Sequence, residues 1–352
     1  MAKQKSSTES PGQPPIVDKR AGDAASVIQS VLSTLQTTGV LNQASVDLDL
    51  AIGEPQGACR FALKVMSAAA STAALAGASA AAPVATVFAG GADLGASPEF
   101  NSEGHHVIAL MAEKDLTQNS PATMQAVNDI LAAVDRDLRE AATFPDDIRN
   151  KQPKTKPFHF IDIPFEDDGA VTPPLPAAPH VLSKLDDFSQ FLSDGGGTKQ
   201  ERADAVSWLI HLFGDVHQPL HCVTHFSDLH PKPEGDRGGN GFRIKSAKKN
   251  LHSLWDSSVN VTQNIDEDAL ADQILQEHPR SSLGRDLAVT DPVKWARASF
   301  ALAKRVAYSL EEDPANPPAP SASYKANMEK IGRKQAALAA YRLADRLTSI
   351  LS

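Results

Sequence analysis

The sequence is poor in cysteine, in aromatic residues and in positive charge. Its two cysteines, Cys59 and Cys222, are too few for a disulfide framework in 352 residues, and they leave the redox compartment open. A net charge of −9 argues against a protein that holds nucleic acid on a broad basic surface. It leaves room for an enzyme whose positive charge comes from bound metal ions. With 41% hydrophobic residues, the chain can bury a sizeable core.

The first hundred residues divide into two segments of different composition. Residues 1–64 are polar and predict a disordered N-terminal extension. Residues 65–92 carry no charge, are rich in alanine and follow Arg60 and Lys64, a pattern typical of a signal peptide. We therefore expect residues 65–99 to be a signal-like segment and linker, and the protein to be secreted or periplasmic. The late position of these Ala-rich residues in the chain favours an alternative, in which they form a linker or helix. Alanine anchors poorly in membranes, so no membrane anchor is expected.

Helical patterns dominate residues 100–352, which we expect to form one mainly α-helical domain. Ser120 precedes a proline and is typical of a helix N-cap, and Thr198 with Glu201 has the sequence of a capping box. The helix that begins there must end or bend before Pro219. The Gly-rich stretch "GDRGGNGFRIK" predicts a short β-hairpin, and other strand patterns are few.

The apolar segment "WLIHLFGDVHQPLH", residues 208–221, contains several ionisable side chains. Polar groups in such a segment cost free energy unless they are paired or bound. His211 and Asp215 are four residues apart, so on a helix they share one face, one turn apart. An imidazole and a carboxylate placed in this way can bind one cation. His217 falls on another face, and we interpret it as a structural residue or as a partner of a ligand.

A second pair, His252 and Asp256 in "HSLWD", repeats the same spacing. His221 follows the bend at Pro219, which can turn its side chain toward the same space. A single histidine on an apolar helix face is more often a hydrogen-bonded core residue than a ligand, but two such pairs favour metal binding. Nitrogen and carboxylate ligands without thiolate suit zinc, with manganese and iron as alternatives.

Six motifs, taken in order, resemble the S1/P1 nuclease family of zinc-dependent single-strand nucleases. They are "GHHVIALMAEKDL", "FPDDIR", "FHFIDIP", "WLIHLFGDVHQPLH", "GDRGGN" and "NLHSLWD". The resemblance covers roughly residues 100–351. It implies a compact, mainly α-helical fold of the kind shared with zinc phospholipase C, with three zinc ions at the bottom of a cleft. It also implies cleavage of single-stranded DNA and RNA to 5′-nucleotides and removal of 3′-phosphates from nucleotides.

The resemblance further implies roles for individual residues. Arg149 would contact the phosphate, and Asp215 would be catalytic as a bridge between two zinc ions. Phe160 and Asp162 would line a base pocket. The implied metal ligands are Asp146, His159, His211 and Asp215 for the first zinc, His221, His252 and Asp256 for the second, and Asp215, His105 and Phe100 for the third.

The third zinc site is where this sequence departs from the family pattern. The family usually has tryptophan at the position of Phe100, as the first residue of the mature chain, and its free amino group and carbonyl oxygen bind the metal. Here 99 residues precede Phe100, and a peptide nitrogen is a poor ligand. The third site therefore needs a cleavage after Glu99, or it lacks one ligand.

The expected function is hydrolysis of single-stranded DNA and RNA by a zinc-activated hydroxide, with 3′-nucleotidase activity. The expected partner is a single-stranded nucleic acid or nucleotide substrate, and no stable protein partner is implied. A zinc phospholipase C-type phosphodiesterase is one alternative, although that family usually has glutamate at the position of Asp256. A non-catalytic exported zinc-binding protein is another, and the complete ligand set together with Arg149 argues against it.

Overall fold

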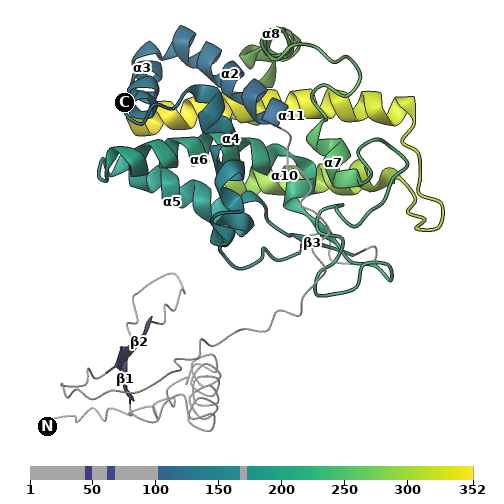
Figure 1. Ribbon diagram of the computed structural model, residues 1–352, viewed down its shortest axis with the longest axis horizontal. Coiled ribbons are helices and arrows are strands. Elements are labelled where there is room, and N and C mark those ends of the chain that lie inside the picture. The colour runs from purple at the N-terminus through teal and green to yellow at the C-terminus, as the bar shows by residue number, and fades with distance from the viewer. Residues whose placement is uncertain (1–43, 50–61, 68–101, 167–172, 352) are drawn as a thin grey trace, which may run out of the picture. The chain divides into compact units, whose positions relative to one another are not determined.

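The chain divides into two units, Met1–Gly90 and Gly91–Ser352. A computed structural model describes residues 44–49, 62–67, 102–166 and 173–351 (Figure 1). Apart from the two strands in the first unit, the expected polar extension 1–64 and the signal-like segment 65–99 lie outside the described residues. Phe100 lies outside them as well.

The strands of the described residues are short. They are β1 (Ala44–Asp49), β2 (Ala62–Ser67), β3 (Pro164–Phe165) and β4 (Thr224–His225). β1 pairs with β2 in antiparallel fashion, and β3 pairs with β4 in parallel. The Gly-rich stretch expected to be a hairpin forms turns, and one isolated antiparallel bridge joins Arg243 to Asn250. The Asp236 carboxylate favours turns here, because it accepts hydrogen bonds from the backbone N–H groups of His225 and Gly239.

The second unit is built from helices. The α-helices are α2 (Ser102–Asn119), α3 (Pro121–Ala132), α4 (Leu138–Arg149), α5 (Val181–Ser193), α6 (Lys199–His217), α7 (Leu251–Asp256), α8 (Glu267–Glu277), α9 (Gly284–Leu287), α10 (Pro292–Arg305) and α11 (Ala322–Leu351). The 3₁₀ helices are η1 (Pro153–His159), η2 (Pro219–Cys222), η3 (Arg280–Leu283) and η4 (Ala307–Ser309). The expected mainly α-helical fold is confirmed. No helix in the described part of the chain is long and apolar enough to cross a membrane.

Helix ends follow the local sequence in most places. The Thr198 side chain accepts a hydrogen bond from the Glu201 N–H, and the Glu201 carboxylate accepts one from the Thr198 N–H, so the expected capping box of α6 is confirmed. α6 ends at His217, two residues before Pro219, as expected. Ser120 precedes α3 but makes no side-chain capping hydrogen bond.

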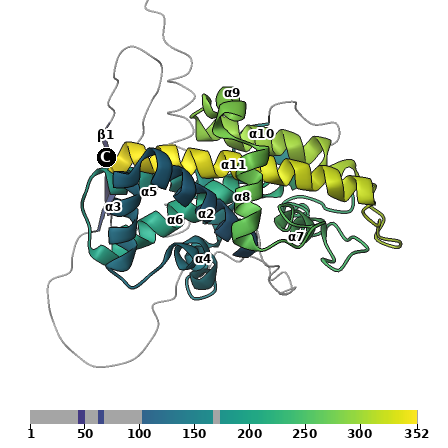
Figure 2. The ribbon, with the colours of Figure 1, turned by 90° about the horizontal axis from the view of Figure 1, so that it is seen from above.

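Helix α6 lies at the centre of the second unit, where α2, α4, α5, α10 and α11 all pack against it. Figure 1 shows the long α11 running beside α5 and α6, and Figure 2 shows α4 and α7 on one side of α11. Every residue of α6 from Ala205 to His217 is buried. A helix buried on all sides has no face where polar groups can reach water. Each ionisable side chain in its last two turns therefore needs a partner inside the protein.

Candidate metal centre

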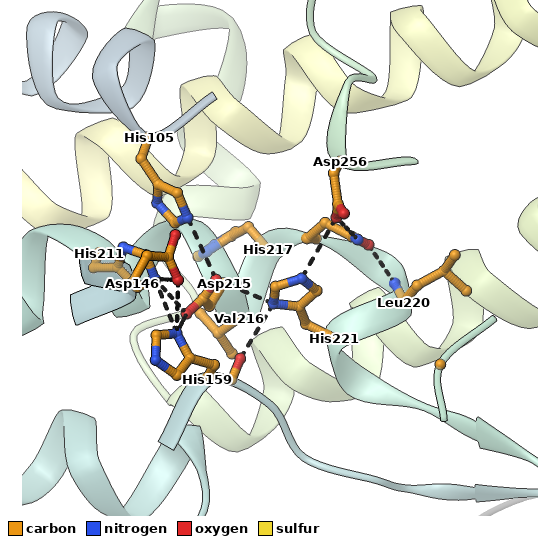
Figure 3. A network of polar contacts seen from close by, with 12 residues as sticks. His105, Asp146, His159, His211, Asp215, Val216, His217, Leu220, His221 and Asp256 are labelled. Atoms are coloured by element: carbon orange, nitrogen blue, oxygen red, sulfur yellow. Dashed lines mark hydrogen bonds and ion pairs between the residues drawn. The ribbon is translucent and has the colours of Figure 1, made fainter. Parts of the chain in front are cut away.

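The structure brings eight of the nine expected metal-binding residues together around the C-terminal end of α6 (Figure 3). They are His105 on α2, Asp146 on α4, His159 at the end of η1, His211 and Asp215 on α6, His221 on η2, and His252 and Asp256 on α7. Phe100, the ninth, is not among the described residues. Segments that are far apart in the sequence thus contribute to one buried cluster.

The first group of this cluster is formed by Asp146, His159 and His211, whose nearest ligand atoms lie within 4.8 Å of one another. His159 Nδ1 lies 3.0 Å from His211 Nε2, and each of these nitrogens lies 3.2 Å from Asp215 Oδ2. Asp146 Oδ1 is 3.6 Å from His211 Nε2 and 3.7 Å from His159 Nδ1. Two imidazole nitrogens and two carboxylates around one point form a donor set that suits zinc.

The second group is formed by His221, His252 and Asp256, again within 4.8 Å of one another. Asp256 Oδ1 lies 3.6 Å from His221 Nε2 and 3.7 Å from His252 Nε2. Among the described residues, these two nitrogens and Asp256 Oδ2 are buried without a hydrogen-bond partner. Buried polar atoms are seldom left unsatisfied, because each costs about 1–3 kcal/mol. A bound cation would satisfy all three atoms together.

Asp215 lies between the groups. Its Oδ2 faces His159 and His211, while its Oδ1 lies 3.1 Å from His221 Nδ1 and 3.6 Å from His105 Nε2. A third group, consisting of His105, His211 and Asp215, meets the same 4.8 Å criterion. His211 therefore belongs to two groups, whereas the sequence suggested only Asp215 as a shared residue.

Hydrogen bonds to backbone carbonyls fix how the histidines present their nitrogens. His211 Nδ1 lies 2.8 Å from the Ala142 oxygen, and His252 Nδ1 lies 2.8 Å from the Gly238 oxygen. A nitrogen that donates to a carbonyl carries a proton, so the Nε2 of each ring is the nitrogen that faces the cluster and offers its lone pair when the ring is neutral. This tautomer is the one that binds a metal ion.

Burial and mutual interaction shift the pKa values of the cluster. Burial alone would raise the pKa of Asp215, but His211 and His221 outweigh it and hold that pKa well below its ordinary value. Burial opposes protonation of His211, yet Asp215 and Asp146 raise its pKa to about 9. Burial and the neighbouring His211 lower the pKa of His105. The carboxylates thus favour positive charge in the cluster. Without a metal ion, protons on the histidines supply this charge, and a bound metal cation would replace them.

Glycine at position 214 allows α2 to approach α6 at the cluster. A Cβ atom there would lie 2.9 Å from His105 Nδ1, which is shorter than the contacts that Cβ atoms normally make with other heavy atoms. The His105 ring stacks on the His211 ring with 3.7 Å between centroids, so it has little room to move. Gly214 therefore gives the His105 ring its place in the third group.

Gln218 is a residue of the cluster that the sequence analysis missed. Its side chain is buried, and its Nε2 donates a 2.7 Å hydrogen bond to Asp256 Oδ1. Its Oε1 accepts a hydrogen bond from the Leu220 N–H in the turn that carries His221. One side chain therefore contacts an expected ligand and supports the backbone next to another. An amide beside Pro219 in an apolar segment was the available signal.

His217 has no place in the metal groups. Its Nδ1 lies 2.7 Å from the Phe213 oxygen, and its Nε2 lies 2.6 Å from Arg342 Nη1. Burial and the Arg342 charge lower the pKa of His217 to about 3. The ring is therefore neutral, with one nitrogen donating and the other accepting. The structure agrees with a structural role for this residue.

Comparison with known proteins gives the family. A family model for S1/P1 Nuclease matches residues 100–352. The chain belongs to the S1/P1 nuclease family. Endonuclease 1 from Arabidopsis thaliana is 28% identical over 233 residues, which cover 60% of this chain and 70% of the relative. Endonuclease 4 from the same plant is 26% identical over 46% of this chain and 55% of its own length. Nuclease S1 from Aspergillus oryzae is 24% identical over 44% of this chain and 53% of its own length.

Membership of the S1/P1 nuclease family supports a nuclease activity, that is, hydrolysis of phosphodiester bonds. The histidine and aspartate groups could hold the metal ions of such an enzyme. Because the matches to Endonuclease 4 and Nuclease S1 span little more than half of those proteins, similarity alone does not extend their substrates to this chain.

The expected substrate-binding residues of this S1/P1 nuclease lie next to the metal groups. Arg149 is the last residue of α4, and its Nη1 lies 3.9 Å from Asp146 Oδ1. Phe160 directly follows η1, and Asp162 follows in the extended segment that leads to β3. The Asp162 side chain reaches solvent, but the surrounding protein limits its hydration and, with the Asp236 carboxylate, raises its pKa to about 6. These positions are compatible with contacts to a phosphate and a base.

Proposed function

We propose that this protein is a zinc-dependent phosphodiesterase that cleaves single-stranded DNA and RNA to 5′-nucleotides and removes 3′-phosphates from nucleotides. The observation that carries the proposal is the convergence of three ligand groups on Asp215, with buried atoms in the second group that lack hydrogen-bond partners. Histidine and aspartate donors without thiolate fit zinc. Membership of the S1/P1 nuclease family supports phosphodiester chemistry at this centre.

The residues around the centre suit this reaction. Zinc ions bound there would lower the pKa of water toward neutrality and offset negative charge on the phosphate. Asp215 presents one oxygen to the first group and the other to His221, so it holds the two sides of the centre at a fixed separation. Arg149 has a planar guanidinium that can donate paired hydrogen bonds to phosphate oxygens. Its place beside Asp146 puts this group at the edge of the first metal group.

Phe160 and Asp162 supply the contacts that we propose for the base. An aromatic ring can stack on an unpaired base, which is worth about 1–3 kcal/mol and tolerates sequence variation. The Asp162 carboxylate can accept hydrogen bonds from the amino groups of a base. Bases stacked within a duplex cannot enter such a contact without being flipped out, so single strands are the preferred substrate.

We also propose that the protein is exported to the periplasm or secreted. The uncharged, Ala-rich residues 65–92 and the two basic residues before them support this. Intact mass of the protein recovered outside the cytoplasm tests it, and a chain that retains residues 1–64 would contradict it. A chain that begins at Phe100 would carry a free amino group as a third-site ligand.

Activity of the purified protein tests the proposed function directly. Zinc content should be measured together with the release of acid-soluble nucleotides from single-stranded DNA, single-stranded RNA and duplex DNA. We expect rapid release from both single strands and slow release from the duplex. Full zinc loading without release from either single strand would overturn the proposal. Hydrolysis of phosphatidylcholine vesicles in its place would support a phospholipase C-type enzyme.

A further inference from the structure

Two basic segments of this acidic protein lie just before expected metal ligands in the sequence. The first, residues 149–158, precedes His159, and the second, residues 237–250, precedes His252; neither contains an aspartate or glutamate. Their cations are Arg149, Lys151, Lys154 and Lys156 in the first segment, and Arg237, Arg243, Lys245, Lys248 and Lys249 in the second. Such clustering in a chain with a net charge of −9 concentrates positive potential on particular parts of the surface.

The lysines and the second-segment arginines are available to a ligand. All of these side chains are exposed. None of them forms an ion pair with another described residue, whereas Lys184, on the neighbouring helix α5, is paired with Asp187 at 2.7 Å. Exposed cations without a protein partner are the groups that a polyanion can neutralise with release of its own counterions.

Ordered backbone holds both segments in place. In the first, the Thr155 N–H donates a 2.9 Å hydrogen bond to the Gln152 oxygen at the start of η1. In the second, the Ile244 N–H donates a 2.9 Å hydrogen bond to the Lys249 oxygen, which closes a tight loop just before α7. The cations are therefore presented from fixed positions, so less order has to be imposed on them when a ligand binds.

Chain length places the cations close to the centre. Lys156 is three residues before His159, and Lys249 is three residues before His252. Since an extended chain spans at most about 3.6 Å per residue, each lysine Cα lies within about 11 Å of the Cα of its ligand. His159 belongs to the first metal group and His252 to the second. One segment therefore lies near the first metal group and the other near the second.

We propose that these two segments bind the phosphate backbone of a single-stranded polynucleotide on the two sides of the bond that is cleaved. The inference rests on the proposed function, because the centre itself would hold one phosphate. Flanking phosphates need positive partners, and the free cations beside each metal group supply them. The segments thereby favour long strands over mononucleotides and dinucleotides, which lack the flanking charges.

The test uses the zinc-loaded full chain and three triple variants. The first variant replaces Lys151, Lys154 and Lys156 with Gln; the second replaces Arg243, Lys245 and Lys248 with Gln; the control replaces Lys199, Lys294 and Lys330 with Gln. The control lysines are also exposed and unpaired, but they lie on α6, α10 and α11. Lys199 is twelve residues from His211, about 18 Å along the helix. All variants change the net charge equally.

The readout is kcat/KM for a 20-nucleotide oligothymidylate and for thymidylyl-thymidine between 50 and 200 mM NaCl. The slope of log kcat/KM against the logarithm of salt concentration is negative. Loss of three phosphate contacts makes this slope less steep by about 2 for a single strand. We expect this change in both segment variants and not in the control, with less than a twofold effect on the dinucleotide. A wild-type slope in a segment variant would overturn the inference for that segment. Failure of the zinc-loaded wild type to cleave either substrate would instead refute the proposed function.

Discussion

The contacts of the two ring nitrogens distinguish a histidine that can bind a metal ion from one that cannot. His211 and His252 use Nδ1 to donate to a backbone carbonyl, which leaves Nε2 directed into the metal groups. His217 contacts a carbonyl through Nδ1 and Arg342 through Nε2, so no nitrogen remains for a metal. Helical spacing distinguished His217 from His211, but the partner of each nitrogen could not be read from sequence because Arg342 is distant along the chain.

Replacement of Asp215 by Asn should abolish nuclease activity. The amide keeps the shape of the side chain but removes the negative charge that faces His211 on one side and His221 on the other. Cleavage of single-stranded DNA and zinc content should be measured together. Asp187→Asn, which removes an exposed carboxylate from α5, is the control and should retain wild-type activity. A wild-type rate in Asp215→Asn would exclude a shared role for this carboxylate.

Replacement of Gln218 by Leu should weaken zinc binding by about 10–100-fold, the usual effect of losing a partner of a metal ligand. The change removes the hydrogen bond to Asp256 and the support of the turn before His221. Competition with a chromophoric chelator measures the affinity. Gln335→Leu is a matched control, since that buried amide donates a hydrogen bond to the His217 backbone oxygen and, among the described residues, forms none with an expected metal ligand. Equal zinc affinity in the two variants would show that Gln218 has no special role.

His217 should make folding stability depend on pH. Its folded pKa of about 3 lies below the value of about 6.5 expected in the unfolded chain, so the unfolded state binds the proton more readily. Stability is therefore complete above pH 6.5 and decreases by about 1.4 kcal/mol per pH unit below it. Urea unfolding of metal-free wild type and His217→Gln between pH 7.5 and 4.5 measures the difference. Parallel stability curves for the two proteins would contradict this assignment.

At the scale of elements, the helix ends were predictable where local chemistry decides them. Thr198 and Glu201 begin α6 with a capping box, and Pro219 follows its end. The helix that Ser120 was expected to begin, α3, ends at Ala132, and Asp137 forms a new capping box with Glu140 at the start of α4. That break places Asp146 and Arg149 at the centre. Its position depends on packing against α2 and α6, which sequence periodicity does not report.

Replacement of Gly214 by Ala should disturb the metal centre although alanine favours helices by about 1 kcal/mol over glycine. The new Cβ would lie 2.9 Å from His105 Nδ1 and displace a ring that stacks on His211. We expect less bound zinc per protein at equal free zinc, with unchanged helical circular dichroism. Gly284→Ala is the control, because a Cβ there meets no atom within 4 Å. Wild-type zinc binding by Gly214→Ala would show that His105 does not need this space.

At the scale of the whole molecule, composition indicated a sizeable core and argued against a broad basic surface. The net charge did not indicate where positive charge lies, and exposed lysines and arginines that form no ion pair with a described residue are concentrated in two short segments before His159 and His252. The sequence motifs contain the expected ligand residues that the structure brings together, since histidine and aspartate recur there at helical spacing. The sharing of His211 between two groups follows from the close approach of α2 to α6 at Gly214, a tertiary contact that spacing along the chain does not encode.

Removal of metal should destabilise the whole helical unit, because the ligands come from α2, α4, η1, α6, η2 and α7. A cation that binds only the folded chain adds about 2.7 kcal/mol per site at a free concentration of one hundred times its Kd. For a unit of this size, each kcal/mol corresponds to roughly 2–4 °C in Tm.

Thermal unfolding after dialysis against EDTA should therefore occur several degrees lower and recover when zinc is restored. EDTA saturated with zinc controls for the chelator itself, and Asp256→Asn should show a smaller shift than wild type. An unchanged Tm in metal-free protein would mean that the buried histidines and aspartates stabilise one another without a metal ion.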